Sequence, residues 1–255
     1  MKPFNQINMK QLLLSVFTIS MFISANAQTT KTTEKPPVKI DLSNRASDHF
    51  MIQYGKDSWG STPDSIRTKS SSRHFNFYFM LDKPFKNNPK FSVAYGAGIS
   101  SSNIFFDKNY VNIKSNSSKL PFSRSVSGTD SSSFDKFKLT TIFLEAPVEL
   151  RYYSNPEHPG SSWKFAIGAK VGTLLSAYTK GKDLQNKNGQ SLYGNKYIAK
   201  ESSKKYFNTT RLALSARAGY GAFGLQFSYQ LTQVIKEGFG AEVRPYSIGL
   251  TISGL

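Results

Sequence analysis

The sequence predicts an all-β protein: an eight-stranded, antiparallel, up-and-down transmembrane β-barrel with short periplasmic turns and long extracellular loops. Three observations lead to this fold. Eight segments alternate between apolar residues at one parity and polar or small residues at the other, the period of a strand with two different faces. Long and short connections alternate along the chain, as in outer-membrane barrels. An export signal precedes all eight segments.

Residues 1–27 have the three parts of a secretory signal peptide. Lys2 and Lys10 make a positive start, residues 12–23 (LLLSVFTISMFI) form an apolar core, and Ala-Asn-Ala at 25–27 is a small-residue cleavage site. The apolar core is shorter than the roughly 20 residues that a membrane-spanning helix needs. We therefore expect the segment to direct export rather than to anchor the chain.

The following residues, 28–47, are polar and aperiodic, and they predict a flexible periplasmic leader. The barrel is expected over residues 48–255. Its eight segments are residues 48–55, 74–82, 91–100, 139–154, 164–178, 211–220, 223–232 and 245–253. Each is near the 9–11 residues that a tilted transmembrane strand needs. Aromatic residues near the segment ends, among them Tyr152, Trp59 and Tyr178, suit the two membrane interfaces.

The segment 139–154 (LTTIFLEAPVELRYYS) shows how the two faces are assigned. Its even positions from Ile142 to Tyr152 are apolar and should face lipid, so its odd positions should face the barrel interior. In 164–178 the same alternation places Leu175 on the lipid side and Ser176 inside. If Tyr152 pairs with Phe165 across the turn, Pro147 lies opposite Lys170.

Charged residues fall on the predicted interior face. The expected interior charge network contains Glu145, Glu149, Arg151, Lys170, Arg211 and Arg217. Side chains fill an eight-stranded barrel, and a buried charge without a partner is costly. The network should therefore be a salt-bridged plug, with Lys170 paired to Glu149 or Glu145. A proton or ion path through the barrel is the functional alternative.

The amino-acid composition excludes several classes of function. The chain has no cysteine, which excludes disulfide scaffolds, thiol catalysis and zinc–thiolate sites. Its formal net charge of +17 points to an anionic partner or surface, with simple solubility as the alternative. Export argues against nucleic acid and favours the phosphates of lipopolysaccharide. No spacing around His49, His74 or His158 singles out a nucleophile, and there is no phosphate loop or metal cluster, so we expect neither an enzyme nor a cofactor.

The predicted long connections are strongly basic. The third one, residues 179–210, carries the candidate contact residues Lys180, Lys182, Lys187, Lys196, Lys200, Lys204 and Lys205. They could contact lipopolysaccharide or an acidic partner, or simply solvate a mobile loop. A soluble eight-stranded calyx with an apolar interior is an alternative for the whole fold, but it does not explain why long and short connections alternate.

The sequence resembles a known family at two adjacent segments and near its C-terminus. LEAPVELRYY followed by KFAIGAKVGTLLSAY is similar to a strand pair of the PorT-like outer-membrane β-barrel proteins of the Bacteroidota, with a proline in the first strand, spaced glycines in the second and a final Leu-Leu-Ser. RPYSIGLTI resembles the closing strand of that family. The likeness covers roughly residues 48–255. One departure is the C-terminus, which ends Ile-Ser-Gly-Leu instead of in an aromatic residue.

The resemblance implies an eight-stranded barrel in the outer membrane of a Gram-negative bacterium and little about activity, although some relatives take part in protein secretion. Two functions from different classes follow. The first is a monomeric structural or interaction protein whose basic loops contact lipopolysaccharide or an acidic partner. The second is an accessory component of outer-membrane transport or protein secretion, with a protein partner.

Overall fold

The computed structural model describes residues 49–60, 62–126 and 132–254. The predicted signal peptide (1–27) and periplasmic leader (28–47) lie outside the described residues. The barrel strands are β1 (Phe50–Gly60), β2 (Arg73–Pro84), β3 (Phe91–Phe106), β6 (Ser133–Tyr153), β7 (Trp163–Gln185), β9 (Thr210–Tyr220), β10 (Phe223–Gln230) and β11 (Arg244–Ser253). None of the helices in the described part of the chain is long and apolar enough to cross a membrane.

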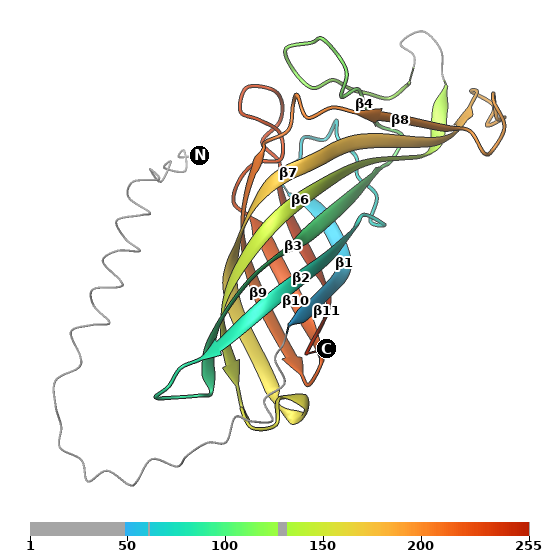
Figure 1. The fold of residues 1–255 in the computed structure, drawn as a ribbon. Coiled ribbons are helices and arrows are strands. Elements are labelled where there is room, and N and C mark those ends of the chain that lie inside the picture. Colours follow the sequence, from blue (N-terminus) through green and yellow to red (C-terminus); the bar gives the residue numbers. More distant parts are fainter. Residues whose placement is uncertain (1–48, 61, 127–131, 255) are drawn as a thin grey trace, which may run out of the picture. The chain divides into compact units, whose positions relative to one another are not determined.

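The eight strands close into one barrel. Each pairs antiparallel with its neighbours in the chain, in the order β1-β2-β3-β6-β7-β9-β10-β11, and the pairing of β1 with β11 completes the ring (Figure 1). In this closing seam Met51 lies opposite Ser253 and Gly55 opposite Gly249. The predicted eight-stranded antiparallel up-and-down barrel is thus confirmed.

The connections divide the barrel into two ends. Residues 85–90, 154–162 and 221–222 join strands at what we call the short-turn end. The remaining connections, including the one that holds β4 (Tyr110–Val111) and β5 (Phe122–Ser123), lie at the long-loop end. The 154–162 turn contains the single-turn helix η1 (Pro159–Ser161).

The two faces of the strands follow the predicted alternation over most of the barrel. Leu144, Val148 and Leu150 are 42–52% exposed on the outside, whereas Glu145 and Glu149 are at most 2% exposed inside. The predicted pairs Tyr152–Phe165 and Tyr220–Phe223 are both present in the register. An apolar exterior around a polar, filled interior is the arrangement that a bilayer requires.

The strand β7 departs from the predicted alternation at a β-bulge. Ile142 pairs with Ser176 but the next residue, Phe143, pairs with Leu174, so Leu175 is an extra residue in β7. Residues of even number, such as Lys170, face inward before the bulge; after it, odd-numbered residues such as Ala177 do. The prediction that Ser176 faces inside is therefore wrong, because one unpaired residue reverses the phase of a strand.

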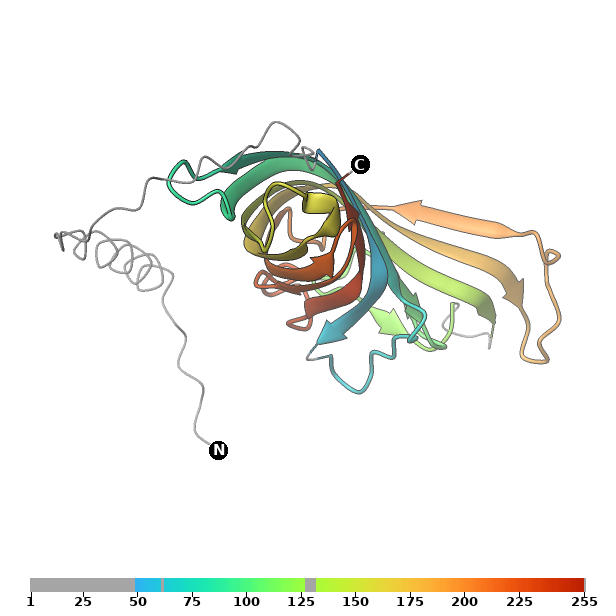
Figure 2. The same cartoon turned by 90° about the horizontal axis from the view of Figure 1, so that it is seen from below.

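The strands β6 and β7 are much longer than predicted. Their pairing continues beyond the other strands to Ser133 opposite Gln185, and β8 (Ile198–Ser202) adds to the outer edge of β7. Figure 2, which looks along the barrel, shows this β6–β7–β8 extension projecting to one side of the ring. The region 179–210 is consequently not a simple loop, because its first residues continue the ladder.

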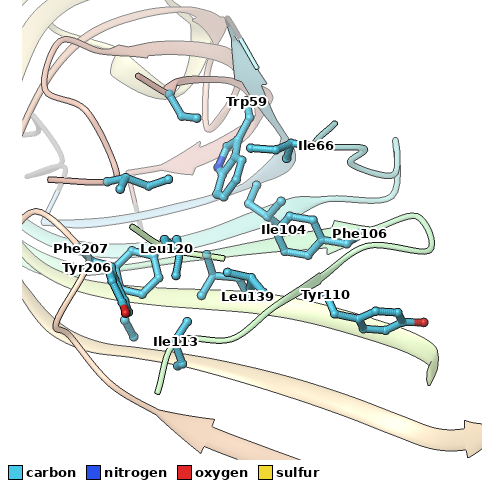
Figure 3. Close-up of a cluster of buried hydrophobic side chains, with 14 of the residues drawn as sticks. Trp59, Ile66, Ile104, Phe106, Tyr110, Ile113, Leu120, Leu139, Tyr206 and Phe207 are labelled. Carbon is cyan, nitrogen blue, oxygen red and sulfur yellow. The ribbon is translucent and has the colours of Figure 1, made fainter. Parts of the chain in front are cut away.

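An apolar cluster fills the long-loop end of the barrel (Figure 3). Inward-facing residues of the strands meet residues from the connections there, and the labelled members are Trp59, Ile66, Ile104, Phe106, Tyr110, Ile113, Leu120, Leu139, Tyr206 and Phe207. Backbone and side-chain hydrogen bonds join the connections to each other, including Leu120 N to Phe239 O at 2.7 Å and Tyr206 Oη to Ser115 O at 2.6 Å. Trp59 is 7% exposed, so its predicted place at the membrane interface is wrong: odd positions of β1 face inside.

Candidate functional site

The interior charges gather around two glutamates of β6. Glu149 accepts hydrogen bonds from Arg151 Nε at 3.0 Å and from Arg217 through Nε at 3.1 Å and Nη2 at 2.6 Å. Glu145 lies 2.9 Å from Arg211 Nη1 and accepts a hydrogen bond from Tyr78 Oη at 2.6 Å. Two carboxylates are therefore held by three arginines in the middle of the barrel.

Small residues of β7 make these ion pairs possible. Gly172 lies directly opposite Glu145 on one side and Arg211 on the other, and Gly168 lies opposite Glu149. A Cβ atom at Gly172 would be 2.8 Å from Glu145 Cγ, and one at Gly168 would be 2.9 Å from Glu149 Cγ. Because β7 has no side chain at these points, arginines of β9 can reach across it to β6.

Lys170 lies where the sequence placed it but with different partners. It is opposite Pro147, as predicted, and it is 3% exposed. Its Nζ atom donates to Gln53 Oε1 at 3.0 Å and to Tyr78 Oη at 3.4 Å, and it lies 4.9 Å from the centre of the Tyr78 ring. The expected ion pair between Lys170 and Glu149 or Glu145 is wrong, because the arginines occupy both carboxylates.

The interior leaves little free space. A cavity beside Arg151 and Arg217 at the short-turn end holds about 20 Å³, and one between Trp59 and Arg211 holds about 10 Å³. Each is the size of roughly one water molecule. Together with the apolar cluster above them, the ion pairs make the barrel a filled structure.

A second polar group inside the barrel was not found from the sequence. His74 Nδ1 lies 2.9 Å from Asp57 Oδ1, and His74 Nε2 lies 2.7 Å from Gln226 Nε2, across the seam where Gly55 and Gly249 have no side chains. Ser102 Oγ also donates to Asp57. The serine bonds the carboxylate rather than the imidazole, so this group does not have the arrangement of an activated nucleophile. Among the described residues no group of three or more His, Cys, Asp or Glu could hold a metal ion.

The predicted basic residues occupy three kinds of position. Lys180 and Lys182 belong to β7 and Lys200 to β8, so their assignment to a loop is corrected. Lys187 and Lys196 lie in the connection between these strands, and Lys204 and Lys205 follow β8. Lys205 Nζ donates to Ser115 O at 3.0 Å, which ties it to the neighbouring connection.

The strand lysines form a regular surface that we call the lysine face: Lys136, Lys138, Lys180, Lys182 and Lys200. Lys138, Lys180 and Lys200 stand directly opposite one another across β6, β7 and β8, and Lys136 stands opposite Lys182. The bulge at Leu175 creates this surface, because it turns the even residues of β7 from the interior to the outside. Sequence periodicity alone would have placed Lys180 and Lys182 inside.

The lysine face carries five positive charges without an ion-pair partner in the described part of the chain. No carboxylate there lies within ion-pair distance of any of its five lysines. Like charges directly opposite one another destabilise a sheet. Partial relief comes from neutral contacts: Lys200 Nζ lies 4.4 Å from the centre of the Tyr178 ring, and Lys138 Nζ donates to Asn103 Oδ1 at 2.7 Å. An anion placed over the rows would offset the remaining repulsion.

The closed ring with an apolar exterior and a salt-bridged interior defines an integral outer-membrane β-barrel. The family model described as "Outer membrane protein beta-barrel domain" matches residues 45–236, and the chain belongs to this family. The protein is accordingly a component of the outer membrane of Gram-negative bacteria. A comparison with curated proteins finds no match.

The solved structures that are similar to this chain include two of the same barrel protein. One is Ail, the attachment invasion locus protein of Yersinia pestis, with 14% identity and a TM-score of 0.34. The other is the same protein in complex with the heparin analogue sucrose octasulfate, with 12% identity and a TM-score of 0.28. Each match covers 80% of this chain and 94% of the other.

Proposed function

We propose that the protein is a monomeric, non-catalytic interaction protein that binds anionic groups of the outer leaflet through the lysine face. The observation that carries this proposal is the alignment of Lys138, Lys180 and Lys200 on one face of three adjacent strands, without a carboxylate in ion-pair distance among the described residues. The proposal places the long-loop end outside the cell and relies on residues 1–27 for export. The basic residues outside the strands, Lys187, Lys196, Lys204 and Lys205, add positive potential around this face.

The position of the lysine face supports a lipid as the anionic partner. Lys138 lies four residues from the lipid-facing Ile142, which is about 13 Å along a strand. This distance supports a position of the lysines beyond the apolar belt, at the level of the lipid headgroups. Lysine ammonium groups bind phosphate as point charges, and the phosphates of lipopolysaccharide are the anions present at that level of the outer leaflet.

The proposal can be tested by removing equal charge from two places. The triple variant Lys138→Gln, Lys180→Gln, Lys200→Gln removes the longer lysine row. The control variant Lys187→Gln, Lys196→Gln, Lys204→Gln removes the same charge from positions that are not aligned. Both should fold, and only the first should lose most of its binding to vesicles that contain lipopolysaccharide. Equal losses would mean that net charge, rather than the lysine face, determines binding.

The second candidate is an accessory role in outer-membrane transport or protein secretion. The resemblance to PorT-like proteins of the Bacteroidota supports it, and so does β8, which among the described strands pairs only with β7 and leaves its other edge open to a partner strand. Affinity purification from cross-linked membranes tests this role. Recovery of the barrel alone, together with lipopolysaccharide, would count against it.

A further inference from the structure

A basic concavity lies beside the lysine face at the long-loop end. Its volume is about 280 Å³, and its lining combines three cationic residues, Lys69, Arg73 and Lys136, with Ser71 and three phenylalanines, Phe105, Phe106 and Phe137. No acidic residue belongs to the lining. The concavity opens on the outer surface, because Arg73 and Phe105 are at the lipid-facing parity of β2 and β3.

Backbone hydrogen bonds fix the wall of this concavity. The segment before β2 runs antiparallel to the end of β3: Thr68 and Phe106 form an isolated bridge, and Lys69 N donates to Phe105 O at 2.7 Å. Phe105 N in turn donates to Ser72 Oγ at 3.0 Å. The backbone at Lys69 and Arg73 is therefore held in place by the sheet.

Several cations converge on this concavity. The guanidinium carbon of Arg73 lies 5.4 Å and Lys138 Nζ lies 5.6 Å from the centre of the same Phe105 ring. Lys69 has one carboxylate neighbour, Asp107, at 3.8 Å, and both side chains are about half exposed. A pair of this length in water contributes little. The site therefore holds more positive charge than its own residues neutralise.

We propose that this concavity binds a phosphate monoester carried on a sugar. The planar guanidinium of Arg73 can donate two parallel hydrogen bonds to a phosphate, while Lys69 and Lys136 add point charges and Ser71 adds a hydroxyl donor. Phe105 contributes an apolar part of the lining for the sugar to contact. A volume of about 280 Å³ is just below the roughly 300–1,000 Å³ of small-molecule pockets, which suits a phosphate with one ring rather than a whole lipid.

The natural source of this group is the phosphorylated sugar headgroup of an outer-leaflet lipid, and this one step rests on the proposed function. Lys136 belongs both to the concavity and to the lysine face. The concavity is thus a discrete site at the edge of a broad basic surface, where one phosphate of a multiply charged headgroup would be bound specifically. Free sugar phosphates carry the same chemistry without the lipid.

The test uses the full protein in detergent free of lipopolysaccharide, with glucose 1-phosphate, inorganic phosphate and glucose as probes in calorimetric titrations. We expect glucose 1-phosphate to bind more tightly than either of the other two. The double variant Lys69→Gln, Arg73→Gln should weaken this binding by about tenfold or more, since charge-assisted hydrogen bonds are lost. Arg73→Lys keeps the charge but loses the paired donors, so its affinity for glucose 1-phosphate should lie between those of the wild type and the double variant.

Two matched controls separate the site from general charge effects. Lys83→Gln removes a cation that lies 5.7 Å from the Tyr95 ring on the same outer surface at the short-turn end, and it should leave binding unchanged. The variant Lys180→Gln, Lys200→Gln should leave binding of the soluble probe unchanged while it weakens binding to vesicles with lipopolysaccharide. Equal binding of glucose 1-phosphate by the wild type and the Lys69, Arg73 double variant would overturn the proposed site. If neither set of variants loses binding to the vesicles, the proposed function is overturned, whereas the proposed sugar-phosphate site is not.

Discussion

Arg211 of β9 and Glu145 of β6 lie in one cross-strand row with Gly172 of β7 between them, and their Nη1 and Oε1 atoms are 2.9 Å apart. The ion pair spans a strand instead of joining neighbours, and this is possible because Gly172 has no side chain. A single glycine thereby determines how two charged strands are connected inside the barrel.

Substitution of this glycine should destabilise the barrel. In Gly172→Ala the new Cβ would be 2.8 Å from Glu145 Cγ and 2.9 Å from Leu144 O, so the backbone must move. We expect the free energy of unfolding to fall by about 1–3 kcal/mol, the usual cost of overpacking. Gly160→Ala is the control, since nothing lies within 4 Å of its added Cβ. Urea titrations of both variants in lipid vesicles give the comparison, and equal stabilities would refute the steric role of Gly172.

The ion pairs should show strong coupling that Lys170 does not share. Glu149→Gln removes the carboxylate that Arg217 bonds and one of the two that Arg151 contacts, the other being Asp82 at 3.9 Å. Removing one partner of a buried pair costs about 3–5 kcal/mol. A double-mutant cycle with Arg217→Met should give a coupling energy of about 0.5–3 kcal/mol. The cycle between Glu149→Gln and Lys170→Met should give a smaller value, because Lys170 donates to Gln53 and Tyr78. A larger coupling for Lys170 would contradict the observed partners.

The exterior of β7 should tolerate apolar residues and reject charge. Val171 is 52% exposed on the outer face, one residue from the buried Lys170. Val171→Leu should leave the free energy of unfolding nearly unchanged. Val171→Lys should lower it by roughly 2–4 kcal/mol if the residue lies near the bilayer midplane. Tolerance of the lysine would show that this face does not contact lipid.

Deletions in β7 can test whether the register beyond the bulge, rather than the bulge itself, positions the lysine face. Removal of Leu175 takes away the extra residue and leaves regular pairing, so Lys180 and Lys182 should stay outside and binding to lipopolysaccharide should persist. Removal of Thr179, which is not part of the bulge, shifts the distal residues by one and should turn both Lys180 and Lys182 inward. Vesicle binding of the two deletion variants distinguishes these cases; loss of binding in both would show that the bulge itself is required.

Protease added to intact cells should reveal which end faces outside. Lys187 and Lys196 are exposed in the connection between β7 and β8, and trypsin should cut there. Lys86 and Lys90 are exposed in a short turn at the other end and should be cut only after the cells are permeabilised. The reverse order of cleavage would place the lysine face in the periplasm.

The strands and their faces were predictable because lipid and a filled interior impose opposite requirements on alternate residues. Ion-pair partners were not, since they depend on which residues of β6 and β9 lie beside the glycines of β7. The lysine face could not be predicted because it depends on the position of the bulge. The run Thr173–Ala177 does not indicate which residue is extra. The apolar cluster was missed because Ile113, Leu120 and Tyr206 belong to apolar runs of only a few residues within polar connections, too short to show a strand period.

The closing seam between β1 and β11 has a consequence for biogenesis. Met51 and Ser253 belong to opposite ends of the barrel sequence, so the ring cannot close until nearly all of the chain has been delivered to the membrane. Contacts between residues so distant in sequence form slowly, and until they form two strand edges remain unpaired. Gly55 and Gly249 face each other in this seam, and a Cβ at Gly55 would be 2.3 Å from Gly249 Cα. The last hydrogen-bonded ladder to assemble is therefore one whose centre has no side chains in the way, which lets the final strand dock closely against the first.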